Sequence, residues 1–154
     1  MFQPEHADHT SGTAHHDDRV QYLVVGDETS LAELQSELAL LPLCARGRVF
    51  VEVPEPADVF ALDVPLRMTV TWLTRSTRAG RPGTATGCAP GEAIERAVGA
   101  WSAEMLCDGP GGTHAVLTGR YQGVSAVYDH LVDRIGMSSD AIAAPAAFGL
   151  RTSH

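Results

Sequence analysis

The sequence lacks lysine entirely, and it also lacks any long hydrophobic run. Its 154 residues carry 11 basic side chains, all of them arginine, against 19 acidic ones, which gives a formal net charge of −8. Such a charge repels nucleic-acid backbones and anionic membrane surfaces, so neither is an expected partner. No apolar stretch approaches the roughly 20 residues that cross a bilayer. The chain starts without the basic and apolar segments of a secretory signal, and we therefore expect a soluble, cytoplasmic protein.

Cysteine is scarce as well. Cys44, Cys88 and Cys107 are far apart and odd in number, so they form neither a CxxC pair nor a disulfide framework. We expect reduced thiols with structural roles. Nucleophilic catalysis has little support, because Ser125 in "GVSAV" lacks the second glycine of a nucleophile elbow.

The first 19 residues are rich in histidine and aspartate and show no periodic apolar pattern. A segment of this composition cannot bury enough apolar surface to order itself, so residues 1–19 are predicted to be a disordered tail, and residues 151–154 a short C-terminal one. Four histidines of the first tail are candidate metal ligands: His6, His9, His15 and His16. Imidazoles beside carboxylates suit Zn, Ni, Cu or ferric iron. The alternative is a solvated tail that binds metal only incidentally.

Residues 20–150 are expected to form a single domain, since their number suits one hydrophobic core. Apolar runs predict strands at 20–25, 48–53, 67–73 and 113–119. Apolar spacing of three and four residues predicts helices at 30–41, 92–106 and about 124–135. Residues 141–154 fit no pattern clearly. Strands separated by crossovers predict an α/β fold, with a mostly parallel, doubly wound sheet and helices on both faces.

The first strand leads into the turn "GDETSLAEL", which is a candidate ligand site. Gly26 removes a Cβ where a sharp turn is expected, and Asp27, Thr29 or Ser30 can cap the following helix. A helix N-terminus attracts anions, whereas Asp27 and Glu28 would repel a phosphate unless they point elsewhere. By itself the turn is either a nucleotide site or a well-capped loop.

Four stretches together resemble one family in their order and spacing: "YLVVGDETSLAEL", "GRVFVEVPEPAD", "VTWLTRS" and "AVLTG". They are similar to the C-terminal, Rossmann-like domain of siderophore-interacting proteins, and the resemblance covers about residues 20–150. Those proteins resemble ferredoxin reductases. An N-terminal barrel holds FAD, the C-terminal domain holds NAD(P)H, and the flavin passes electrons to a ferric siderophore.

The resemblance implies a set of cofactor-binding residues. These are Gly26, Asp27, Glu28, Thr29, Arg75, Ser76, Gly119 and Arg120. The turn at Gly26 would lie beside the pyrophosphate or the nicotinamide, and Gly119 would let the cofactor lie close. Arg75 and Ser76 would meet the adenosine ribose or its 2′-phosphate, since a guanidinium beside a hydroxyl suits a phosphate. The alternative is that Arg75 is an exposed, solvated arginine of a polar loop.

This sequence departs from the family at two places. Gly119-Arg120-Tyr121 stands where the family has Gly-Glu-Ala, a charge reversal that either favours a phosphate or marks decay. The C-terminal Tyr-Trp-Arg-like element is replaced by "AAFGLR", whose aromatic residue is Phe148.

The resemblance implies a stand-alone NAD(P)H-binding domain that contributes to flavin-dependent ferric-siderophore reduction. No flavin barrel precedes Val20 in this sequence, so FAD is expected only through a flavin-domain protein from another chain. NADPH is the favoured cofactor, the ferric siderophore is an indirect partner, and no catalytic residue is assigned. Whether the domain is an active enzyme stays open. The alternative is a degenerate, non-enzymatic Rossmann-like module for protein or metal interaction in iron handling.

Overall fold

A parallel β-sheet runs through the centre of the computed structural model, which describes residues 20–80 and 87–150. Its strands are β1 (Gln21–Asp27), β2 (Arg46–Val53), β3 (Arg67–Thr74), β4 (Thr113–Leu117) and β5 (Ile142–Ala143). Their spatial order is β3-β2-β1-β4-β5, and each neighbouring pair is parallel. The last five residues of both β1 and β2 are buried, because both faces of these central strands are covered.

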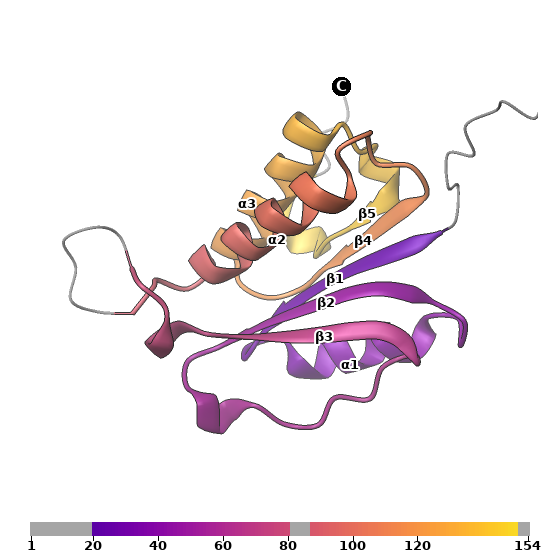
Figure 1. The fold of residues 1–154 in the computed structure, drawn as a ribbon. Helices are drawn as coiled ribbons and strands as arrows, with labels where there is room; N and C mark the ends of the chain where they lie inside the picture. Colours follow the sequence, from indigo (N-terminus) through magenta and orange to yellow (C-terminus); the bar gives the residue numbers. More distant parts are fainter. Residues whose placement is uncertain (1–19, 81–86, 151–154) are drawn as a thin grey trace, which may run out of the picture.

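Helices cover the sheet on both faces (Figure 1). α1 (Leu31–Leu40) packs on one face, whereas α2 (Glu92–Met105) and α3 (Tyr121–Asp129) pack on the other. Two apolar cores result. The larger lies between the sheet and α2 and α3, and the smaller lies between α1 and the opposite face. The predicted α/β, doubly wound, Rossmann-like fold is confirmed.

Most element boundaries agree with the apolar pattern to within a few residues, but the last third of the chain differs. α3 begins at Tyr121, earlier than expected, and continues as a π-helical turn, His130–Ile135. β5, which pairs two residues with β4, was not predicted from the sequence. A strand of two residues in an alanine-rich segment has no alternation to reveal it.

Short 3₁₀ turns complete the description: Pro56–Asp58, Arg75–Thr77, Ser139–Ala141 and Ala146–Phe148. Among the described residues, no helix is both long enough and apolar enough to cross a membrane. The terminal segments 1–19 and 151–154 lie outside the described residues, as does 81–86.

The direction in which successive strands are added across the sheet reverses at β1. From β1 the chain winds outward through β2 to β3, and then returns through α2 to β4 on the other side of β1. Ligands of such sheets bind outside the carboxyl ends of the strands at this switch point. The turns that follow β1, β3 and β4 all emerge at that edge, so the candidate residues are brought to one region of the molecule.

Candidate functional site

Gly26 lies inside β1 and not at a sharp turn, which corrects the expectation from the sequence. A Cβ at this position would lie 2.9 Å from Leu34 Cδ2 on α1 and 3.1 Å from Thr118 Oγ1. The missing side chain therefore lets α1 pack closely on β1. Helix packing accounts for this glycine.

Asp27 is buried at the end of β1 and holds two other segments in place. Its Oδ1 accepts hydrogen bonds from the backbone N–H and the hydroxyl of Thr29, and its Oδ2 accepts one from the backbone N–H of Arg120 at 2.8 Å. Ser30 Oγ accepts a hydrogen bond from the Asp27 backbone N–H, so the serine braces the turn. The carboxylate thus ties the β1–α1 turn to the start of α3.

Gly119 is required by this arrangement. Its φ is +113°, a region that L side chains rarely adopt, and a Cβ would lie 2.5 Å from Asp27 Oδ2. From the sequence we expected a cofactor to lie close to Gly119, but the Asp27 carboxylate fills the space beside it.

Glu52, near the end of β2, belongs to the site although it was not predicted from the sequence. Its side chain is fully buried; Oε1 accepts hydrogen bonds from Arg75 Nη1 and the Gly91 N–H, both at 2.8 Å. Oε2 accepts one from the Ile94 N–H at 3.1 Å. Glu52 therefore occupies the N-terminus of α2, a position where a doubly wound fold could hold a phosphate. The lone acid in "VFVEVP" was the available signal, because a buried strand rarely carries an unpaired charge.

Arg75 follows β3 and is held by two carboxylates. Nη1 donates to Glu52, and Nη1 and Nη2 donate to the two oxygens of Glu28 at 3.1 and 2.6 Å. Its side chain is only 11% exposed. The hydrogen bond with Glu28 raises the pKa of Arg75 above its ordinary value. Ser76 is exposed beside it, and its backbone N–H donates to the Pro54 carbonyl.

Glu28 connects Arg75 to Arg120. Arg120 Nη1 donates to Glu28 Oε1 at 2.5 Å, and the same oxygen accepts from Arg75. Burial by itself raises the pKa of Glu28, but the hydrogen bonds from the two arginines outweigh it and hold that pKa at about 2. From the sequence we expected the acids of this turn to repel a phosphate unless their side chains point elsewhere. Glu28 points at the two guanidinium groups.

Two arginines and three acids therefore meet at the carboxyl edge of the sheet. Asp27 and Glu52 accept hydrogen bonds from backbone N–H groups and are 4% and 0% exposed, so both are parts of the framework. Glu28 is 21% exposed at its side chain and is bonded through that side chain to guanidinium groups. The arginine pair, Arg75 and Arg120, has the geometry to hold a phosphate, provided that Glu28 gives way.

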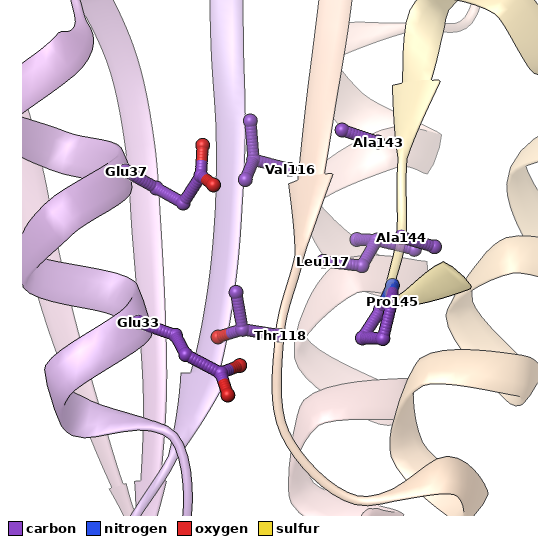
Figure 2. A pocket seen from close by; sticks show the side chains of 8 residues that line it. All are labelled: Glu33, Glu37, Val116, Leu117, Thr118, Ala143, Ala144 and Pro145. Carbon is purple, nitrogen blue, oxygen red and sulfur yellow. The ribbon is translucent and has the colours of Figure 1, made fainter. Parts of the chain in front are cut away.

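A cleft of about 320 Å³ opens nearby, between α1 and the ends of β4 and β5 (Figure 2). Glu33 and Glu37 project from α1 on one side, and Pro145 stands on the other. The remaining lining residues are Val116, Leu117, Thr118, Ala143 and Ala144. Two carboxylates make this cleft a poor phosphate site, so the arginine pair is the better anion candidate.

The other candidates from the sequence lie apart from the arginine pair or outside the described residues. The tail histidines His6, His9, His15 and His16 fall outside them, and residues 20–80 and 87–150 contain no group of three or more side chains placed to hold a metal. Cys44 and Cys107 are exposed free thiols. Cys88 is buried, and this burial raises the pKa of its thiol. Phe148 packs edge-on against the half-exposed ring of Tyr121, with 5.4 Å between centroids.

Comparison with solved structures gives similar folds. The siderophore-interacting protein SipS of Aeromonas hydrophila aligns with a TM-score of 0.59 at 22% identity, over 81% of this chain and 49% of that one. A siderophore utilization protein from T. fusca gives 0.56 at 23% identity, over 80% and 42%. The siderophore-interacting protein of Acinetobacter baumannii gives 0.59 at 11% identity, over 80% and 44%. At these low identities, the likeness establishes the fold.

Sequence comparison gives relatives and a family. Uncharacterized proteins of Mycobacterium bovis and Mycobacterium tuberculosis are 38% identical over 58 residues, which are 38% of this chain and 20% of theirs. The match thus spans a fifth of these curated relatives, and this chain spans less than half of each solved one. The family model for siderophore-interacting proteins matches residues 20–146. Because that match extends over most of the sequence, this chain belongs to the siderophore-interacting protein family.

Proposed function

We propose that this domain binds NAD(P)H, with NADPH favoured, at the carboxyl edge of its sheet and presents it to a flavin. The flavin would be held by a domain outside these 154 residues, and the electrons would go on to a ferric siderophore. Family membership and the doubly wound fold support the proposal. The observation that carries it is the convergence of Arg75 and Arg120 on one carboxylate at this edge.

The residues of the site would bind and orient the cofactor. Arg75 and Arg120 would hold a phosphate through charge-assisted hydrogen bonds, in the geometry that they now use for Glu28. Asp27 and Glu52 would keep the turn, α3 and α2 in position around it. The bound nicotinamide supplies the hydride, and the protein supplies binding and orientation.

The first prediction concerns Arg120, which is the more exposed member of the arginine pair. Arg120→Ala should weaken NADPH binding about tenfold or more, because a charge-assisted hydrogen bond to phosphate contributes roughly 1.5–3 kcal/mol. Titration calorimetry of the full chain measures this change. Arg67→Ala is the matched control, since Arg67 begins β3 at the opposite edge of the sheet and is exposed. Equal affinities for the two variants would remove the arginine pair from the cofactor site.

A second function has one specific observation in its favour. Glu28 already satisfies both arginines, which is what a degenerate module that retains the fold for protein interaction would show. A measurement of NADPH binding distinguishes the two functions. If millimolar NADPH binds neither the wild-type chain nor a Glu28→Gln variant, the cofactor function is wrong and the non-enzymatic module is the better description.

A further inference from the structure

We propose that Glu28 is an internal competitor for the phosphate site, a carboxylate that occupies the arginine pair until an anionic ligand displaces it. The inference rests on the proposed function and concerns how that same site is controlled. Its ligand class is a phosphate group carried by a nicotinamide dinucleotide. The geometry behind it is the three-way contact of Glu28 with Arg75 and Arg120.

The contacts of Glu28 are those of a bound anion. Both of its carboxylate oxygens accept hydrogen bonds from Arg75, in the paired geometry that guanidinium groups use for carboxylates and phosphates. One of these oxygens also accepts from Arg120. A phosphate that bound to either guanidinium in this manner would need the same N–H groups. Glu28 and a phosphate are therefore mutually exclusive ligands of the arginine pair.

Glu28 is also the acid of this site whose side chain can move away from the arginine pair. Asp27 and Glu52 are almost fully buried and accept hydrogen bonds from the backbone, so their departure would strand N–H groups in the interior. Glu28 lies in the short turn between β1 and α1, and its side chain is partly exposed. Rotation of that side chain would release the arginines, while its backbone N–H could keep its hydrogen bond to the Glu52 carbonyl.

The competition has a direct consequence for affinity. A ligand must exchange an existing ion pair for its own, so the apparent affinity is the intrinsic affinity multiplied by the fraction of molecules in which Glu28 has withdrawn. Removing the Glu28 charge should therefore tighten phosphate binding. A purely structural role for Glu28 predicts the opposite, since loss of its contacts would loosen both arginines and weaken any ligand that they hold.

The test is titration calorimetry of the full chain as wild type, Glu28→Gln and Glu33→Gln, each with NADPH, NADH and inorganic pyrophosphate. We expect Glu28→Gln to bind NADPH and pyrophosphate about tenfold tighter than wild type. Glu33→Gln removes an equal charge from the nearby first turn of α1, where no hydrogen bond or ion pair joins the Glu33 side chain to another described residue. The affinity of Glu33→Gln for each of the three ligands should differ from that of the wild type by less than about twofold. A gain for NADPH alone among the dinucleotides would place the 2′-phosphate at the arginines, and an equal gain for NADH would place the pyrophosphate there.

A double variant, Glu28→Gln with Arg120→Gln, checks the route of the effect. It should lose most of the gain, because the arginine that Glu28 released is then absent. Melting curves establish that each variant is folded. If Glu28→Gln does not fold, Glu28→Asp replaces it, since the shorter carboxylate cannot span both arginines and should give at least a threefold gain.

The outcomes separate this inference from the proposed function. Unchanged or weaker binding by the Glu28 variant, with NADPH bound by both proteins, overturns the competition and leaves the function standing. Tighter pyrophosphate binding by the variant with no NADPH binding by either protein supports the competition and overturns the function. Failure of every protein to bind any of the three ligands overturns both.

Discussion

At the scale of single residues, the glycines of this chain divide into those that the fold requires and those that it tolerates. Gly119 has a positive φ and lies against the Asp27 carboxylate, so a side chain is excluded for two independent reasons. Gly99 lies in the middle of α2, where a Cβ would meet no described atom within 4 Å. The same substitution at the two positions should have opposite effects on stability.

The second prediction uses this pair. Gly119→Ala should lower the free energy of unfolding by about 2 kcal/mol or more, through backbone strain and the contact with Asp27. Gly99→Ala should raise it by roughly 0.5–1 kcal/mol, because alanine favours a helix interior over glycine. Urea unfolding followed by circular dichroism measures both changes. Equal effects at the two positions would contradict the role given to Gly119.

At the scale of secondary-structure elements, the carboxyl edge is held together by acids that each bridge two or three elements. Glu52 joins β2 to the N-terminus of α2 and to Arg75 after β3. Glu28 joins the β1–α1 turn to Arg75 and to the start of α3. Because these links cross between elements, their loss should lower the stability of the whole edge.

The third prediction follows from the Glu28 pKa of about 2, which lies below its ordinary 4.5. A carboxyl whose pKa is lowered by folding stabilises the protein fully above the ordinary value, and this contribution is lost as the pH falls toward 2. Glu28→Gln should therefore be less stable than wild type at pH 7 by about 2 kcal/mol, allowing for its partial exposure.

The difference in stability between the wild type and Glu28→Gln should shrink between pH 4.5 and pH 2 and disappear below this range. Urea unfolding of both proteins at pH 7, 4.5 and 3 measures this difference. Subtracting the two free energies of unfolding at each pH removes the contribution of the carboxyls that both proteins share. Glu33→Gln should show no such trend. A Glu28→Gln difference that stays constant from pH 7 to pH 3 would contradict the ion-pair geometry.

At the scale of the whole molecule, the described domain would supply one half of what the proposed electron transfer needs. Under that proposal its arginine pair would hold a phosphate of the cofactor, and the flavin would have to come from outside these residues. Co-purification with a flavin-binding protein would support this division. The half-exposed Tyr121 directly follows Arg120 in the chain, and its ring packs against that of Phe148.

The fourth prediction concerns the histidines of residues 1–19, which stay a metal-binding candidate. The full chain should bind Zn²⁺, because imidazoles beside carboxylates suit this metal. Replacing His6, His9, His15 and His16 by glutamine should reduce that binding at least tenfold. Titration with Zn²⁺ alone measures it. Equal binding by the substituted chain would assign the metal to other residues.

Much of the fold could be predicted from the sequence because its signals are local. The apolar runs before Gly26 and Pro54 are long enough to identify buried strands, and α1 and α2 carry helical spacing. The two-residue β5 could not be predicted, because it exists only through its pairing with β4. The family resemblance selected Glu28, Arg75 and Arg120 as residues of one site, and the structure brings them into contact.

By itself, the sequence determined the segments that form β1 to β4 and the helices, and which charged residues follow the strand ends, since periodicity and turn chemistry act between near neighbours. Only the tertiary structure decided which charges neutralise one another. Glu28 lies 47 positions from Arg75 and 92 from Arg120, and Glu52 lies 23 from Arg75. Such pairs depend on strand order and register, because parallel strands bring their carboxyl ends to one edge whatever their separation in the chain.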